Sequence, residues 1–251
     1  MSCFFIIMCN YFKRLTRDMK EMLILIIIPI GLTVLWSMFG DPVTMEGYNV
    51  TASFNMPALM LSFQFFNMGI MLHFLYHDFR GNLRWRLRAA PHSLLSFVLP
   101  AFVANWIFSI LLGIIIVVVS VVLLNAYLSN ILVFAAVLLL VSLMATFLSM
   151  LVFLFTQTYR AANGLVYIIS FGLMILSGFM IPLGNNPVAR FLNTYGTPLS
   201  LGQRAVMYSG ALNDLVYGGG MPQALGNIGI LAIITLVLAF VTIIAARRRK
   251  I

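Results

Sequence analysis

Residues 94–124 read LLSFVLPAFVANWIFSILLGIIIVVVSVVLL, a run without a single charged side chain. A helix needs about 20 apolar residues to cross the hydrocarbon core of a bilayer. This run is longer, so it predicts a transmembrane helix that is tilted or that extends beyond the bilayer. Further apolar stretches flank it on both sides, at residues 22–39, 54–76, 131–155, 164–181 and 225–246. The sequence therefore predicts an all-α membrane protein with six transmembrane helices.

The composition excludes most soluble architectures. Of the 251 residues, 62% are hydrophobic and only 8% are charged, whereas a soluble domain carries about 25% charged residues. The six apolar stretches leave little chain for anything else. We therefore expect one transmembrane domain over residues 1–251 and no separate catalytic module.

Basic residues predict how the chain is oriented. Thirteen of the 15 Lys and Arg residues lie in the amino-terminal segment, in residues 77–92, at Arg160 and in the carboxyl-terminal tail. The intervening loops hold only Arg190 and Arg204. Lys and Arg accumulate in cytoplasmic loops, so we predict a multi-pass protein of the cell membrane with both termini in the cytoplasm. The net charge of +9 is then membrane anchoring, and no nucleic-acid partner is expected.

The amino-terminal segment, residues 1–21, has helical periodicity. Its apolar residues recur every three or four positions and its basic residues fall elsewhere, which is typical of a helix lying in the membrane interface; the apolar face is Phe5, Met8, Phe12, Leu15 and Met19. The alternative is a partly disordered start. Cys3 and Cys9 are interpreted as free thiols, because they lie near a cytoplasmic basic cluster.

The motifs of an enzyme are missing. The sequence has no Gly-x-x-x-x-Gly-Lys-Ser/Thr loop, so the chain is expected to hold no ATPase site and no bound cofactor. His73 and His77 share a helical face beside Asp78, but two histidines and one carboxylate without a supporting motif are weak evidence for a metal site. We predict no catalytic residue and no metal. No apolar stretch carries a charge near its middle, which argues against a proton- or sodium-coupled transporter.

Uncharged polar residues do lie inside the predicted spans. Gln64 and Asn67 are three apart in the second span, and Asn105 and Ser109 are four apart in the third. Small and amide-bearing residues commonly pack transmembrane helices together. A translocation surface for an amphipathic substrate is the second interpretation, and both stay open at this point.

Residues 77–92, HDFRGNLRWRLRAAPH, form the main basic loop. Arg80, Arg84 and Arg88 recur every four residues and share a helical side, where like charges repel one another. Either anionic lipid headgroups or an acidic groove on a cytoplasmic protein would offset that repulsion.

The order of these features resembles the permeases of type-2 ATP-binding-cassette (ABC) transporters: an interfacial helix, six spans with both ends inside, and a short cytoplasmic helix between spans two and three. In that family the short helix is the coupling helix, which sits on the ATPase subunit. A family pattern of an acidic residue, Gly, Leu and Pro is matched here, with Asp78 where Glu is common. The resemblance implies that the ATPase-coupling residues are Asp78, Phe79, Arg80, Gly81, Leu83, Arg84, Leu87, Arg88 and Pro91.

A second stretch, residues 176–206, is similar to the family's motif after span five. It reads LSGFMIPLGNNPVARFLNTYGTPLSLGQRAV, and the matching residues are Ser177, Gly178, Phe179, Pro182, Pro187 and Pro198. In the family this region forms short helices that dip into the outer leaflet. The resemblance therefore implies a re-entrant region within residues 182–222.

The resemblance also implies a mechanism. Two permease chains pair as a homodimer, and separate ATPase subunits bind ATP and magnesium beneath them. The expected cargo is a drug, antibiotic, peptide or lipid-like molecule that leaves the cell. Two alternatives stay open: a polysaccharide or heme exporter permease, and a membrane sensor or immunity protein that transports nothing.

Overall fold

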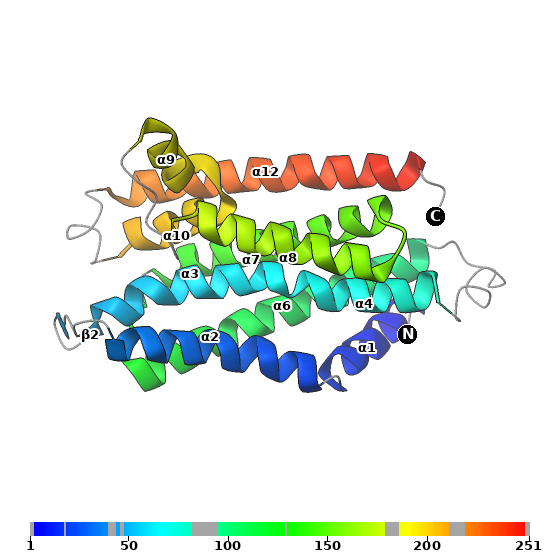
Figure 1. Cartoon of the computed structure of the whole chain (residues 1–251), viewed down its shortest axis with the longest axis horizontal. Coiled ribbons are helices and arrows are strands. Elements are labelled where there is room, and N and C mark those ends of the chain that lie inside the picture. Colours follow the sequence, from blue (N-terminus) through cyan, green and yellow to red (C-terminus); the bar gives the residue numbers. More distant parts are fainter. Residues whose placement is uncertain are drawn as a thin grey trace.

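The computed structural model describes residues 3–17, 19–39, 44–45, 48–81, 95–128, 130–178, 186–210 and 219–248. Long helices run side by side along the longest axis of the molecule (Figure 1). Helix α1 and the end of α12 lie at the same end of this bundle (Figure 1). The helices are α1 (Cys3–Arg17), α2 (Met19–Phe39), α3 (Val50–Phe66), α4 (Met68–Phe79), α6 (Leu95–Leu124), α7 (Ile131–Phe155), α8 (Tyr159–Leu176), α9 (Pro187–Phe191), α10 (Pro198–Tyr208) and α12 (Met221–Arg248).

Five helical segments within the described residues are long and apolar enough to cross a membrane. They are Val50–Phe79 (α3 and α4 together), Phe97–Leu124, Ile131–Phe155, Tyr159–Leu176 and Met221–Arg248. In α2, only Leu23–Leu35 is a described apolar stretch, which is shorter than a full span. The all-α membrane fold is therefore confirmed, while a sixth crossing by α2 stays a prediction.

The predicted bounds of the fifth span, residues 164–181, are wrong by five residues at each end, because α8 runs from Tyr159 to Leu176. Thr158 adopts an extended conformation and its hydroxyl accepts a hydrogen bond from the Ala161 amide, which starts the helix early. Gly178 has φ of 73° just after the last turn, a left-handed conformation that ends helices. Arg160 consequently lies in the first turn of α8.

The span formed by α3 and α4 is the central element. In its most apolar window 78% of the residues are buried, against 17% for α12. Helices α2, α6, α7, α8 and α10 all pack against it, whereas α12 packs outside, on α7 and α10. Side chains fully enclosed by this packing include Leu59, Leu61, Phe65, Leu72 and Leu75. The central span is therefore positioned by contacts on every side.

The central span is interrupted at Asn67. The Ile70 amide donates to the Asn67 carbonyl at 3.2 Å, an i→i+3 bond that tightens the helix for one turn. Beside this break, the Ser149 hydroxyl of α7 donates to the carbonyl of Met68 at 3.1 Å. A neighbouring helix thus satisfies a backbone group at the interruption, as a nonpolar surrounding requires.

The end of the bundle away from α1 holds short elements (Figure 1). Strands β1 (Thr44–Met45) and β2 (Tyr48–Asn49) pair antiparallel. Between α8 and α12 the chain forms α9, a five-residue π-helix (Leu192–Gly196) and α10. Pro187 and Pro198 each occupy the first position of a helix, where proline is favoured because no amide donor is needed. Insertion of this region into the outer leaflet stays a prediction, and residues 179–185 and 211–218 of it lie outside the described residues.

Candidate functional site

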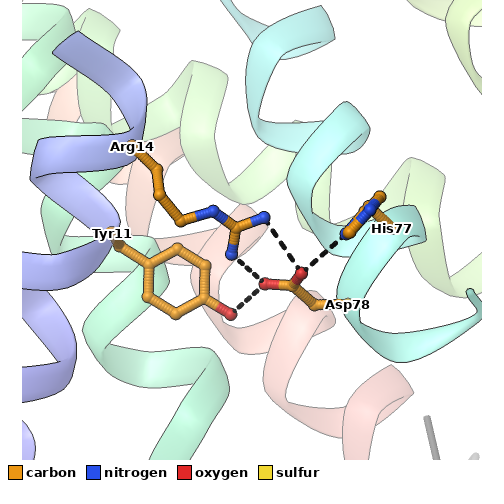
Figure 2. A network of polar contacts seen from close by, with 4 residues as sticks. All are labelled: Tyr11, Arg14, His77 and Asp78. Atoms are coloured by element: carbon orange, nitrogen blue, oxygen red, sulfur yellow. Dashed lines mark hydrogen bonds and ion pairs between the residues drawn. The ribbon is translucent and has the colours of Figure 1, made fainter. Parts of the chain in front are cut away.

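A buried carboxylate lies in the last turn of α4. The Asp78 side chain is only 3% exposed, and it accepts hydrogen bonds from two residues of α1. The Tyr11 hydroxyl donates to Oδ2 at 2.6 Å, and the Arg14 guanidinium donates to Oδ2 at 2.8 Å and to Oδ1 at 3.1 Å. Figure 2 shows Arg14 and Tyr11 converging on the carboxylate from one side and His77 from the other, with His77 Nδ1 3.1 Å from Oδ1. We call these four residues the Asp78 cluster.

Apolar packing brings α1 to this position. Tyr11 and Leu15 are buried in a cluster with residues of α4 and α6, separate from the main core; its other members are Ile70, Phe74, Ala101, Ala104, Phe108 and Leu112. The Arg14 guanidinium also lies over the Phe74 ring, 4.9 Å from its centroid. Helix α1 is therefore seated on α4 and α6 by packing, and the Asp78 cluster fixes its rotation.

The pKa values of Tyr11 and Arg14 are both raised in the Asp78 cluster. Burial raises the pKa of Tyr11 far above its usual range, and the nearby Asp78 carboxylate raises it further. The hydrogen bond to Asp78 likewise raises the pKa of Arg14. Tyr11 consequently stays a donor and Arg14 stays a cation at any physiological pH. Paired with Arg14 and fully hydrogen-bonded, the buried carboxylate avoids most of the free energy that an isolated buried charge costs.

Helix α1 forms within the predicted amino-terminal segment, and its position in the membrane interface stays a prediction. Phe5 of the predicted apolar face is 44% exposed, while Tyr11, which the periodicity did not single out, is 9% exposed. Arg14 lies off the predicted apolar face, and its guanidinium reaches α4. The signal that could have revealed the cluster is the i, i+3 spacing of Tyr11 and Arg14, which puts both on one face, together with the scarcity of acidic partners in this chain.

The residues after Asp78 also have defined places. Phe79 is buried against Phe153 of α7, with ring centroids 6.3 Å apart. Arg80 is exposed, yet its guanidinium donates to the carbonyls of Phe153 and Thr156. A Cβ atom at Gly81 would collide with the His77 carbonyl, so only glycine fits there. The remaining predicted coupling residues lie outside the described residues: Leu83, Arg84, Leu87, Arg88 and Pro91.

His73 and His77 have different neighbours. The His73 ring meets the edge of Tyr159, with centroids 5.5 Å apart, while His77 bonds to Asp78. Among the residues that the structure describes, no three metal-ligating side chains gather at one point. In this arrangement His73 makes aromatic contacts with Phe74 and Tyr159, and His77 makes a polar contact with Asp78.

The candidate translocation residues lie together, inside the bundle. Gln64 Nε2 donates to the Ser109 carbonyl at 3.1 Å, and Asn67 Nδ2 donates to the Ser109 hydroxyl. All four residues of the set, including Asn105, are buried between α3–α4 and α6. The oxygens of the three carboxamides have no hydrogen-bond partner among the described residues. In the conformation seen, Gln64 and Asn67 bridge the central span and α6, and a role of the set in translocation stays a prediction.

Gly113 allows this packing, which gives a testable prediction. A Cβ atom there would lie 2.8 Å from Gln64 Nε2 and 2.6 Å from Leu138 Cδ1. We expect Gly113→Ala to lower the free energy of unfolding by about 1–3 kcal/mol, because the crowded core must shift. Thermal unfolding in lipid nanodiscs measures this. Gly172→Ala is the matched control, since nothing lies within 4 Å of a Cβ atom there; equal effects of both changes would contradict the prediction.

The second motif joins α8 to the short helices that follow. The Ser177 hydroxyl donates to the Met174 carbonyl at 2.8 Å, and a Cβ atom at Gly178 would lie 3.0 Å from Asn193 Nδ2 of the π-helix. Pro187 and Pro198 begin α9 and α10, as described above. Phe179 and Pro182 lie outside the described residues.

Comparison with known families agrees with this arrangement of helices. The family model described as ABC-2 type transporter matches residues 2–210, which is most of the chain. The chain belongs to the ABC-2 type transporter family. A search of curated proteins gave no match. The matched region is the membrane component of an ABC transporter, so this ABC-2 type permease is a multi-pass membrane protein, and its matched domain has no ATPase site. Permeases of this family generally work with a partner ATPase.

Proposed function

We propose that this ABC-2 type permease is the transmembrane subunit of an ATP-driven exporter whose energy comes from an ATPase on a separate chain. The observation that carries the proposal is the fixed position of the end of α4. Asp78 attaches that end to α1, directly before the basic segment that resembles a coupling helix. A segment held in this way can transmit a push from a cytoplasmic partner into the membrane helices.

The side of the membrane follows from the same proposal. The ends of α1, α4 and α12 lie at one end of the bundle (Figure 1), and the basic residues of the sequence concentrate there. We place this end in the cytoplasm, where the ATPase would bind ATP and magnesium. The short elements at the other end, which include α9 and α10, then lie on the outer side.

The substrate class and the assembly are further parts of the proposal. The substrate would be an amphipathic drug, antibiotic, peptide or lipid-like molecule, and two permease chains would pair. Gln64, Asn67, Asn105 and Ser109 would reach such a substrate only if α3–α4 and α6 separate during the cycle, since they are buried here. Cysteine accessibility at Ser109 during ATP turnover tests this: protection in every state would leave these residues a packing role only.

Reconstitution tests the function itself. The permease is purified alone and together with a candidate ATPase partner, and both preparations are placed in liposomes. We expect ATP hydrolysis and ATP-dependent solute movement only when both chains are present. Solute pumping by the permease alone would overturn the proposal. A stable complex that binds ATP but moves nothing would favour the sensor or immunity alternative.

A further inference from the structure

Arg80 bridges α4 and the far end of α7. Its Nη2 donates to the Phe153 carbonyl at 3.0 Å, and its Nη1 donates to the carbonyl of Thr156. The guanidinium also lies beside two neighbouring rings, 4.9 Å from the Tyr76 centroid and 4.8 Å from that of Phe153. Both ends of the guanidinium fork therefore have carbonyl acceptors at the end of α7, and the cation lies against an aromatic pair.

The contact completes the carboxyl-terminal end of α7. The last carbonyls of a helix have no partner within the helix and carry partial negative charge, so a cation placed there is stabilised. Such a cap usually comes from the same helix or the next few residues. Here it comes from a residue 73 positions away from Phe153 in the chain, which ties two segments that the sequence keeps apart.

Tyr76 adds to the same contact between the last turn of α4 and the end of α7. Its hydroxyl donates to the Thr156 carbonyl at 2.9 Å, and its ring meets Phe153 edge-on with centroids 5.2 Å apart. On its other side it meets Tyr159, the first residue of α8, at 6.0 Å. The turn between α7 and α8 is thus held against the last turn of α4.

We infer that Arg80 is a positioning residue that makes the start of the coupling segment and the α7–α8 turn move as one body. This inference rests on the proposed function and names how that function is carried out. A push on the coupling segment then reaches α7 and α8 directly, in addition to the route along α4. Arg80 thus has a structural role within the chain in addition to its charge, although the residue is exposed.

Arg160 supplies a contrast within the same chain. It lies in the first turn of α8, at the same end of the bundle, and it is exposed, as Arg80 is. Replacing either arginine with Gln removes the same charge from the same side of the membrane. Only Arg80→Gln also removes the bridge to Phe153 and Thr156. Comparing the two variants therefore separates the effect of losing a charge from the effect of losing the contact between α4 and the α7–α8 turn.

Spin-label distances test whether the two segments move together. Labels are placed on Lys13→Cys and Phe155→Cys, both exposed, in a chain that also carries Cys3→Ser and Cys9→Ser. Lys13 reports α4 through the Asp78 cluster, and Phe155 reports the end of α7. The distance distribution is measured by double electron–electron resonance in nanodiscs, for the permease–ATPase complex without nucleotide and with ATP and magnesium.

The expected result is one narrow distribution in the unmodified chain and in Arg160→Gln, unchanged by nucleotide. In Arg80→Gln we expect a second population or a nucleotide-dependent shift. Helix α4 has 12 residues and is about 18 Å long, so a tilt of roughly 15° displaces its end by about 5 Å, which the measurement resolves. Distributions of Arg80→Gln that match those of Arg160→Gln in both states would overturn the inference.

Two less disruptive variants test the inference if Arg80→Gln does not fold. Arg80→Lys keeps the charge but loses the second hydrogen bond of the fork, and Tyr76→Phe removes only the hydroxyl bond to Thr156. We expect both to broaden the distribution, and unmodified widths in both would contradict the inference. If the unmodified chain forms no complex with the ATPase, the proposed function fails, whereas the nucleotide-free comparison of the two arginine variants still reports on the contact between α4 and the α7–α8 turn.

Discussion

A permease that carries Leu83→Asp and Leu87→Asp is expected to reach the membrane and to lose its ATPase subunit. The two leucines fall on one side of the basic segment, next to the arginines, and the family resemblance seats that side on the ATPase. Burying a leucine contributes about 1.5–3 kcal/mol. Losing two such contacts should weaken binding by about a hundredfold or more, since 1.4 kcal/mol corresponds to tenfold.

Co-purification through a tag on the permease measures this loss. Leu83→Met with Leu87→Met is the control, because it keeps an apolar side chain of similar size. Both leucines lie outside the described residues, so the prediction depends on sequence pattern and resemblance alone. An intact complex with normal ATP hydrolysis in the aspartate variant would reduce the segment to a lipid anchor.

The second large effect is expected at Asp78. Asp78→Ala leaves the Tyr11 hydroxyl and the Arg14 guanidinium without their acceptor, so α1 should loosen from α4. A double-mutant cycle with Arg14→Ala isolates the pair. Because the Arg14 side chain is 36% exposed and water partly replaces the lost contact, we expect a coupling free energy of about 1–3 kcal/mol rather than the larger value of a fully buried pair.

Thermal unfolding in nanodiscs gives the four free energies that the cycle needs. Arg17→Ala is the matched control, since Arg17 is an exposed arginine one turn along the same helix. Asp78→Glu should retain most of the stability, because Glu keeps the charge and is common at this place in the family. Additive effects of Asp78→Ala and Arg14→Ala would show that the cluster contributes nothing as a unit.

The hydrophobic pattern predicted the helices because a membrane span is recognisable in a sequence by its length and its lack of charged residues. The predicted bounds of α7, residues 131–155, agree with the structure at both ends. The error at α8 arose because a capping hydroxyl and a positive-φ glycine, not hydrophobicity, set its ends. A hydropathy profile contains no information about such local hydrogen bonds.

The candidate site was predictable only in part. Asp78 stood out as an acidic residue beside a basic loop, and resemblance gave it a role. Its partners on α1 and the destination of Arg80 depend on how helices pack, because Tyr11 is 67 residues from Asp78 and Thr156 is 76 residues from Arg80. Periodicity places a residue on a face, but it does not say which helix that face meets.

The side-chain amides of the central span should affect how the chain is inserted into the membrane during synthesis. Val50–Phe79 has a mean hydropathy of 1.5 in its best window, against 3.3 for Phe97–Leu124. Among the described residues, Gln64 and Asn67 both donate to Ser109, which is synthesised later. Leaving such amides unpaired in lipid costs several kcal/mol. We therefore expect the central span to be retained at the insertion machinery until α6 emerges. Glycosylation mapping should show poor integration of chains that stop at Phe79 and full integration of chains that extend past Leu124, and equal integration of both would contradict this order of assembly.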